Sequence, residues 1–583
     1  MEKRVFLAIF LSFVVLALYQ SYFAPRPAPR PAPAATAPGT PTAPGATPAA
    51  PGATPATAGA TPAAAAPAAP APAPLEAPAI DPAARDVVVE TDTVRATFTT
   101  AGATLKSWRL KKYLDWQGQP LDLIPADAPA QRPFTLATDD AAQSAALASA
   151  VYQPSAEGLS LGTGTGTLAF QYRDKSGLRA EKRFYFQPDG KRYVVNVEAT
   201  IEFNGVAKPI MIYGGAGLGM GYAADGSAPH PPRAVQMRNG KVERLTAATL
   251  QEQPRYEGEF RFAGVEDQFF VTTAVVAGEQ ARLEYAPLHL PVPGNTAGLM
   301  REFIAYSVSP NLGVAPSRAV TIPFFIGPKD IDVLSAVDQR LENAIDFGMF
   351  AWLVRPLLRS LKWLNGYLHN YGWSIVALTI LINLAIFPLR HRSMVSMRKM
   401  QALQPEIKAI QDRYAKYKVT DPERQKMNAE MMALYKQKGV NPVSGCLPML
   451  LTMPILFAFY AMLSVAIELR GAPFFGWIHD LSVRDPLYIT PIVMGATMFW
   501  QQWLTPSTAD PMQKRIFMLM PIIFTFTFLA FPAGLVIYWL VSNLMAISQQ
   551  LVTNRLLGPP PQPRLAKAAA GAPPPKTMRK GQS

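Results

Sequence analysis

Thr379 and Asn383 are polar residues, four positions apart, in a stretch of chain that is otherwise strongly apolar. Residues at i and i+4 lie on the same face of a helix, so the hydroxyl and the amide would be neighbours. The other apolar stretches also carry uncharged polar residues, namely Thr452, Thr525, Thr527, Ser542 and Asn543. Such groups can join helices by hydrogen bonds, or they can line a hydrated groove within a bilayer. The residues alone leave both interpretations open.

The chain contains none of the short motifs that mark common catalytic or nucleotide-binding sites. HExxH, CxxC, GxSxG and GxxxxGK[ST] are all missing, and the five histidines are widely scattered. The single cysteine, Cys446, excludes an internal disulfide and a multi-cysteine metal site. Two Gly-rich stretches, 161–167 and 214–221, are more typical of turns and strand edges than of phosphate loops. The sequence therefore predicts a non-enzyme without a metal or cofactor.

The apolar stretches predict membrane-spanning helices. Only 16% of the 583 residues are charged and 49% are hydrophobic, which argues against a single soluble globular domain. Six stretches contain no Asp, Glu, Lys or Arg and are about long enough to cross the ~30 Å hydrocarbon core: 5–23, 371–389, 446–467, 487–504, 516–531 and 533–551. For the first of them, an uncleaved anchor is favoured over a signal peptide, because residues 22–24 form a poor cleavage site.

The composition changes three times between the first two stretches. Residues 24–82 are mostly Ala, Pro, Gly and Thr, with 17 prolines among the 56 residues 24–79, and predict a disordered, semi-stiff spacer. Residues 83–328 are rich in alternating β-branched runs and predict one large antiparallel β-sandwich. Residues 329–370 predict amphipathic helices with Trp, Leu and basic residues, which either lie at a membrane–water interface or pack on the sandwich.

Loop charge predicts the orientation of the chain, which carries a net charge of +14. Residues 390–438 hold 12 Lys/Arg and 5 Asp/Glu, and the tail 555–583 holds six Lys/Arg and no acid. The loop 468–486 holds only two Arg against three acids. By the positive-inside rule, both termini and the segment 390–441 are cytoplasmic, and the β domain lies on the opposite side.

The segment 390–441 predicts a basic helical hairpin. Apolar residues recur at steps of three and four from residue 400 to 417, which is a coiled-coil seam. Methionine surfaces adapt to varied apolar partners, so we expect the thioether side chains to touch clients or partners. A rigid connector is the alternative. The residues concerned are Met394, Met397, Met400, Met427 and Met431.

The membrane half resembles the YidC family of membrane-protein insertases. Three long stretches carry the resemblance: MNAEMMALYKQKGVNPVSGCLPMLLTMPILFAFYAML (427–463), ELRGAPFFGWIHDLSVRDPLYITPIVMGATMF (468–499) and DPMQKRIFMLMPIIFTFTFLAFPAGLVIYWLVSN (510–543). An N-terminal anchor and a large β domain also resemble the Gram-negative form of the family. The resemblance is weaker in the β domain and does not extend to the spacer.

The resemblance implies both a fold and a function. Five helices would enclose a hydrophilic groove that receives a hydrophobic segment of a nascent protein and releases it sideways into lipid. Implied partners are nascent membrane proteins, the Sec translocon, the ribosome and membrane lipids, and the implied location is the cell inner membrane with the β domain in the periplasm. The β domain would be a supersandwich related to sugar mutarotases.

The sequence departs from the family at the groove. Alignment on Pro388-Leu389 places Asn383 where the family usually has an arginine, so we expect an uncharged groove in which Asn383→Arg is tolerated. Thr452 replaces a usual glutamine and Trp539 a usual tyrosine. The expected groove and client contacts are Asn383, Thr379, Thr452, Thr525, Trp539, Tyr538, Met453 and Phe528.

The prediction is a multi-domain membrane protein with a bundle of six transmembrane helices and a periplasmic all-β supersandwich. A secondary transporter would need buried ionisable residues and repeated half-bundles, and a cell-envelope polysaccharide factor would act through the β domain. The expected domains are an anchor 1–23, a linker 24–82, a β domain 83–328, interfacial helices 329–370, a second transmembrane helix 371–389, a cytoplasmic hairpin 390–441, further transmembrane helices 442–554 and a basic tail 555–583.

Overall fold

A computed structural model describes residues 83–115, 117–124, 132–215, 218, 231–291, 300–310, 319–417, 421–440, 447–504 and 511–558. The predicted anchor 1–23, the whole predicted linker 24–82, Cys446 and the tail beyond residue 558 lie outside these ranges. Residues 405–439 form a compact unit distinct from the one that contains the β domain and the other helices. Each unit is described by itself below.

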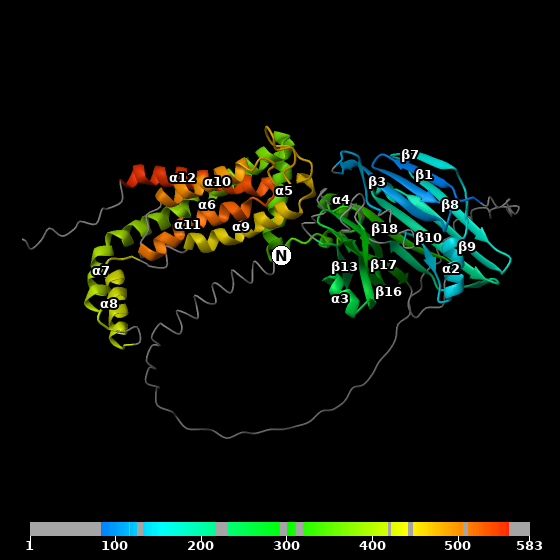
Figure 1. Cartoon of the computed structure of the whole chain (residues 1–583), viewed down its shortest axis with the longest axis horizontal. Helices are drawn as coiled ribbons and strands as arrows, with labels where there is room; N and C mark the ends of the chain where they lie inside the picture. The colour runs from blue at the N-terminus through cyan, green and yellow to red at the C-terminus, as the bar shows by residue number, and fades with distance from the viewer. Residues whose placement is uncertain are drawn as a thin grey trace, which may run out of the picture. The chain divides into compact units, whose positions relative to one another are not determined.

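The β domain is built from two sheets (Figure 1). One has five strands in the order β4-β3-β2-β1-β7, and the other has thirteen, with a main path β14-β13-β15-β16-β18-β10-β9-β8-β6. The strands are β1 (Asp86–Thr91), β2 (Val94–Thr99), β3 (Thr104–Leu114), β4 (Pro120–Asp122), β5 (Leu136–Ala137), β6 (Gln153–Pro154), β7 (Gly158–Gly162), β8 (Gly166–Arg173), β9 (Leu178–Phe186), β10 (Val194–Phe203), β11 (Val206–Ala207), β12 (Met211–Gly215), β13 (Arg233–Arg238), β14 (Lys241–Leu245), β15 (Arg255–Glu266), β16 (Phe270–Pro291), β17 (Met300–Pro310) and β18 (Val320–Pro328). Two short helices, α2 (Ala141–Ser149) and α3 (Ala247–Glu252), join them.

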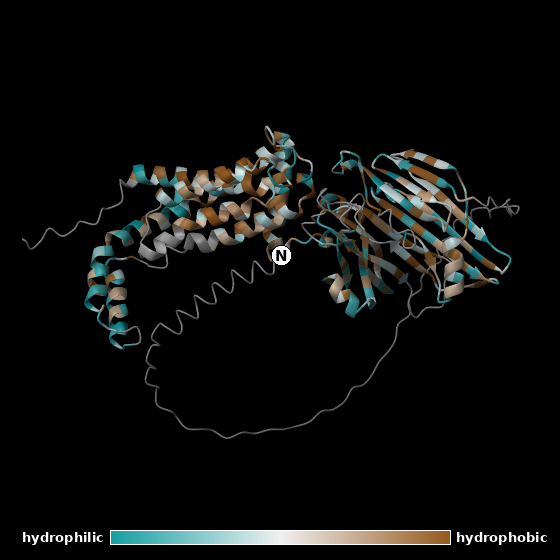
Figure 2. Cartoon of the chain, in the orientation of Figure 1, coloured by the Kyte–Doolittle hydropathy of each residue, from teal (hydrophilic) through white to brown (hydrophobic). Residues whose placement is uncertain are grey.

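Aromatic side chains fill the space between the two sheets. Phe98 on β2 lies 4.7 Å from Phe184 on β9, measured between ring centroids, and the Trp108 indole N–H donates to the Ile326 carbonyl at 2.9 Å. Alternation of apolar and polar residues along the strands, visible in Figure 2, produces this face-to-face packing. The sandwich is not wholly antiparallel as expected, because β1 pairs with β7 in parallel. The long intervening segment makes that crossover possible.

Lys182 on β9 is fully buried between the sheets. Its ammonium donates to the carbonyls of Gly102 at 2.5 Å, Phe134 at 2.7 Å and Ala103 at 3.2 Å. An ammonium has three N–H groups, so this cation is fully hydrogen-bonded. Burial lowers the pKa of Lys182 well below its usual range. The side chain therefore ties β9 to the segments that begin β3 and β5.

A buried ion cluster fixes the connector that leaves the sandwich. Glu266, at the end of β15, accepts Arg233 at 3.1 Å, Arg244 at 3.0 Å and Lys329 at 3.1 Å. Arg233 also reaches Asp346 at 3.2 Å. The connector contains α4 (Ile331–Val337) and the 3-10 turns η3 (Leu341–Ala344) and η4 (Gly348–Phe350). Ion pairs of Lys329 and Asp346, near the two ends of the connector, therefore hold it against the sheet.

Helix α5 (Ala351–Leu368) follows and is amphipathic. It buries Val354, Leu357, Leu358 and Leu361 and leaves Trp352, Trp363 and Tyr367 mostly exposed. Its Lys362 contacts carboxylates of Asp330, Asp332 and Glu468 within 3.1 Å. Although burial opposes its charge, Glu468, Asp332 and Asp330 together raise the pKa of Lys362.

The largely apolar helices, on which brown residues are frequent in Figure 2, are α6 (Tyr371–Ala402), α9 (Leu447–Val465), α10 (Ile489–Leu504), α11 (Pro511–Phe528) and α12 (Ala533–Leu557), with the 3-10 turn η6 (Ile467–Leu469) after α9. Among the described residues, 371–402 and 533–556 are long and apolar enough to cross a membrane, and 452–465 and 518–528 form shorter apolar helices.

Helix α6 does not end at residue 389, where the apolar stretch ends, but continues to Ala402. Pro388 removes one backbone donor, yet the helix passes through it. The α6 helix ends at Ala402, and α7 (Gln404–Arg413) begins two residues later at Gln404, so Pro405 lies in the first turn of α7, where its missing N–H has no helical acceptor.

Residues 405–439 form a helical hairpin, whereas residues 390–402 of the segment predicted as the hairpin, 390–441, belong to α6. Helices α7 (Gln404–Arg413) and α8 (Glu423–Gln437) are antiparallel, since Glu406 pairs with Lys438 at 3.1 Å and Arg413 with Glu430 at 2.9 Å. The buried residues Ile407, Ile410 and Met427 form its apolar seam. Both helices are mostly hydrophilic in Figure 2.

Candidate functional site in the apolar helices

Helix α6 places Thr379 and Asn383 on one buried face, as their spacing predicts. The Thr379 side chain is 0% exposed and its hydroxyl donates to the Ile375 carbonyl at 2.6 Å. The Asn383 amide nitrogen donates to the Thr379 carbonyl at 2.8 Å. Both side chains therefore bond to the turn that precedes them, and the Asn383 amide oxygen is left for another donor.

That donor is Arg390, which sequence analysis assigned to the cytoplasmic hairpin. Its Nη1 donates to Asn383 Oδ1 at 2.9 Å, and the Arg390 side chain is half-buried. The expectation of an uncharged site around Asn383 is therefore wrong. The reason is geometric: residues seven apart return to one helix face after two turns, and side chains lean toward the helix N-terminus.

Helix α12 supplies a second buried amide beside α10. Asn543 is buried, and its amide nitrogen donates to the Thr497 hydroxyl at 3.3 Å. Thr497 in turn donates to the Met494 carbonyl at 2.7 Å. This pair joins two helices, so one of the polar residues singled out from the sequence serves helix–helix hydrogen bonding.

The aromatic residues expected in the groove separate into two contacts. Tyr538 stacks on Phe459 with ring centroids 4.2 Å apart, and it is also an electrostatic neighbour of Arg390. Trp539 lies 5.1 Å from Phe528 by ring centroids. Tyr538 therefore belongs with the α6 polar group, whereas Trp539 and Phe528 form an aromatic contact between α11 and α12.

Thr525 packs against Gly495 where α10 and α11 approach closely. A Cβ at Gly495 would lie 1.9 Å from the Thr525 hydroxyl oxygen, so only glycine fits this position. Thr525 donates to the Pro521 carbonyl at 2.7 Å. Thr452 and Met453 lie half-buried on α9.

Polar contacts also link the C-terminal parts of α6 and α12. Gln549 donates to the Phe387 carbonyl at 3.3 Å. The buried Arg398 donates to the Gly558 carbonyl at 2.7 Å and also bonds the side chain of Asn554. Arg398 therefore caps the end of α12, from which the basic tail continues.

The methionines expected to touch clients fall into two groups. Met394, Met397 and Met400 are half-buried on the extension of α6, outside the hairpin unit. In the hairpin, Met427 is buried in the seam and Met431 is half-buried. Of the hairpin methionines, Met432, which the sequence analysis left out of its site prediction, is the most open, with 59% of its surface exposed.

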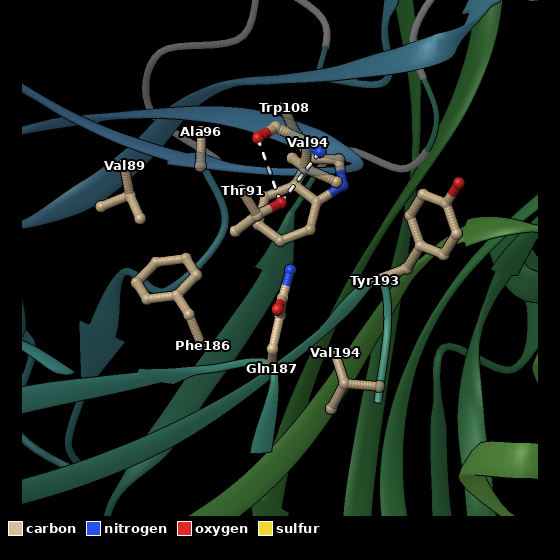
Figure 3. A pocket seen from close by; sticks show the side chains of 9 residues that line it. All are labelled: Val89, Thr91, Val94, Ala96, Trp108, Phe186, Gln187, Tyr193 and Val194. Atoms are coloured by element: carbon tan, nitrogen blue, oxygen red, sulfur yellow. Dashed lines mark hydrogen bonds between the residues drawn. The ribbon is translucent and has the colours of Figure 1, made fainter. Parts of the chain in front are cut away.

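The cavity in Figure 3 lies in the β domain, away from these helices. It is bordered by Val89, Thr91, Val94, Ala96, Trp108, Phe186, Gln187, Tyr193 and Val194. Two of its polar side chains are already engaged: Thr91 bonds the backbone of Val94, and the Gln187 amide donates to Asp92 at 2.8 Å. It offers no cluster of acids or histidines, so it adds no chemistry to the site.

Comparisons with known proteins cover both parts of the chain. Family models described as "YidC periplasmic domain" and "60Kd inner membrane protein" match residues 86–360 and 363–559. A "Membrane protein insertase YidC" from Geobacter metallireducens is 35% identical over 95% of this chain and 98% of the relative. One from Geotalea daltonii is 34% identical over 96% of this chain and 100% of its own.

Solved structures give more distant matches. A crystal structure of an active YidC insertase with its first transmembrane domain resolved aligns with 80% of this chain and 91% of its own, at 18% identity and a TM-score of 0.33. A galactose mutarotase-like protein from Lactobacillus casei aligns with 42% of this chain and 100% of its own, at 12% identity and a TM-score of 0.28.

Proposed function

Because this chain belongs to the YidC family of inner-membrane proteins, we propose that it works as a membrane protein insertase whose client site is formed by α6 and its neighbouring helices. A hydrophobic segment of a nascent protein enters from the cytoplasm and leaves sideways into lipid. The observation that carries the choice of site is the buried polar group Thr379–Asn383, joined by Arg390.

The physical role of such a site is to shorten the apolar path for a polar tail. Each unsatisfied polar group transferred into hydrocarbon costs several kcal/mol. Hydrogen-bonding groups at the depth of Asn383 offset part of that free energy. The client's own apolar helix then supplies the driving force as it partitions into lipid. This process needs neither bond-making chemistry nor a cofactor.

The proposed arrangement has six spans, of which the first is the anchor at 5–23. Both termini and the hairpin are cytoplasmic, and the β domain is periplasmic, because the basic loops mark the inner side. The exposed Trp352, Trp363 and Tyr367 of α5 suit the membrane–water interface. We propose nascent membrane proteins, the Sec translocon, the ribosome and lipids as partners.

Depletion rescue tests this function. Cells that lack their own insertase would express the full chain, and insertion of a small phage-coat-like client would be followed by protease protection of its tail. We expect insertion and growth to be restored. A chain that reaches the membrane at normal levels and restores neither would overturn the proposal.

A further inference from the structure

The turn that follows α9 and η6 exposes a phenylalanine at its tip. Residues 471–478, GAPFFGWI, contain two adjacent phenylalanines and no charged residue. Phe474 is half-buried, and its ring centroid lies 5.1 Å from that of Trp373 at the start of α6. Phe475 has 70% of its surface exposed. The two neighbours therefore face opposite surroundings, and Phe475 contributes little to the apolar core.

Three contacts fix this turn, so the backbone itself holds Phe475 away from the core. The Phe474 N–H donates to the Ile478 carbonyl at 3.0 Å. The side-chain amide of Asn370, which caps α6, donates to the Phe474 carbonyl at 3.0 Å. A Cβ at Gly372 would lie 2.0 Å from the Phe474 ring, so helix and ring are in close contact. The turn is therefore attached to the first residues of α6.

The exposed tip continues a series of aromatic residues at that end of α6. Trp373 has 49% of its surface exposed, and Trp363 and Tyr367, near the end of α5, are exposed too. The helix that begins at Tyr371 is long and apolar enough to cross a membrane. Aromatic side chains concentrate where spanning helices leave the hydrocarbon. The tip therefore lies at the level of a membrane–water interface.

We propose that the turn 471–478 inserts Phe475 into the acyl chains of the outer leaflet and thereby sets the depth of α6 in the bilayer. This rests on the proposed function and its orientation, in which this end of α6 faces the periplasm. An uncharged tip loses no charge hydration in lipid, and burial of an aromatic ring is favourable. Lipid is favoured over a protein partner, because lipid is the phase that surrounds a spanning helix.

An anchor at this level has a consequence for the polar group of α6. Asn383 lies ten residues after Trp373, which is about 15 Å along a helix. That distance is half of the ~30 Å hydrocarbon core. An aromatic anchor beside Trp373 therefore places Thr379 and Asn383 near the middle of the bilayer. Loss of the anchor would let α6 shift along the membrane normal.

The test places a fluorophore on the turn in the purified full chain, reconstituted in vesicles without other proteins. Cys446→Ser removes the single cysteine, and Pro473→Cys adds one at an exposed position of the tip. Quenching by spin labels on lipid acyl chains is compared with quenching by iodide in water. We expect acyl-chain quenching to dominate there. The matched control is Lys175→Cys, at an exposed position of the β domain, where iodide should dominate.

Phe475→Ser, added to the chain labelled at residue 473, tests the role of the ring. We expect the ratio of lipid-inserted to water-exposed turn to fall about tenfold, the effect of losing the burial of an aromatic side chain. Phe475→Leu keeps an apolar side chain and should retain most of the insertion. An unchanged ratio in Phe475→Ser would show that the ring does not anchor the turn.

The depth of α6 is measured separately at Leu381, which is 51% exposed on that helix. A fluorophore on Leu381→Cys is quenched by lipids labelled near the headgroup or near the chain end, and the ratio of the two reports depth. We expect Phe475→Ser to shift this ratio and Phe475→Leu to leave it unchanged. The same ratio in all three chains would overturn the depth-setting role.

Dominant iodide quenching at the tip would overturn the proposal and assign the turn to a protein partner absent from the vesicles. Phe475→Cys supplies a second labelled position if Pro473→Cys fails to accumulate. A membrane-impermeant maleimide should label Lys175→Cys in spheroplasts, and absence of labelling would overturn the orientation. Failure of depletion rescue would overturn the insertase function and leave the quenching results as they are, so these failures are distinct.

Discussion

Two cations, the buried Lys182 in the sandwich and the half-buried Arg390 in the apolar helices, differ in how completely they are paired. Three carbonyls accept all three N–H groups of the Lys182 ammonium. In the part of the chain that the structure describes, one amide oxygen accepts one N–H of the Arg390 guanidinium. Burial of charge alone therefore does not indicate function. The number of N–H groups left without a protein partner separates a cation that holds a fold together from one that can take a ligand.

Replacing the fully paired cation should have the largest effect. In Lys182→Met, three buried carbonyls lose their donor, and each unsatisfied group costs about 1–3 kcal/mol. We expect the free energy of unfolding of the β domain to fall by at least about 3 kcal/mol, measured by urea-dependent proteolysis of the full chain. Lys175→Met, at an exposed position of the same hairpin, should change it little. Equal effects of the two variants would contradict the comparison.

Acid should weaken a second charged contact of the β domain, the one that Asp346 makes with Arg233. Burial opposes its charge, but Arg244 and Arg233 outweigh burial and hold the pKa of Asp346 below its usual 3.8. Its contribution, about 2 kcal/mol for charged hydrogen bonds, is therefore complete above about pH 4 and is lost as pH falls through the lowered pKa. Pepsin cleavage within residues 341–350 should rise over that range. Pepsin should cleave the Asp346→Asn variant faster than the unchanged chain at pH 4. As the pH falls further, the cleavage rate of the variant should not rise through protonation of this residue.

At the site of the sparsely paired Arg390, Asn383→Arg should impair insertion rather than be tolerated. It places a second guanidinium beside Arg390 and removes the acceptor, so we expect about a tenfold loss in depletion rescue, equivalent to about 1.4 kcal/mol. The double variant Asn383→Arg with Arg390→Asn exchanges the two groups and should recover most of the activity. Full activity of the single variant would restore the interpretation of an uncharged site.

The smallest change in stability is expected for a salt bridge between two solvent-exposed side chains. In the hairpin, Arg413 and Glu430 form a salt bridge with 62% and 40% of their side chains exposed. Breaking it with Arg413→Gln should change hairpin stability by no more than about 0.5 kcal/mol, because exposed pairs gain little. Hydrogen exchange of residues 405–439 measures this. We also expect that exchange to be faster than in α6, since few hairpin residues are buried.

The sequence predicted elements where one residue pattern decides the structure. Alternating residues in the β domain and the seam at Ile407 and Ile410 were sufficient to predict strands and a hairpin. Lys182 was missed although its signal was present: in β9 it occupies the inward register shared by Ala180 and Phe184. A lysine at an inward strand position indicates a buried cation and could have been read from the sequence.

Arg390 was missed for a different reason. A hydropathy pattern ends a span at the first charged residue, so Arg390 was assigned to the next segment. Its return to Asn383 depends on α6 continuing through Pro388 and on the direction of its side chain, and neither property is encoded in hydropathy. The parallel β1–β7 pair was missed because strand order depends on contacts distant in sequence.

The position of Pro388 has a mechanical consequence for the same pair. Proline has no N–H, so the carbonyl of Leu384 lacks its helical donor, and α6 is least stiff in the turn between those two residues. That turn lies between Asn383 and Arg390. A bending force on the C-terminal part of α6 would therefore be concentrated where it stretches the hydrogen bond between them. The turn at which α6 bends most easily is therefore also the turn that sets the distance between Asn383 and Arg390.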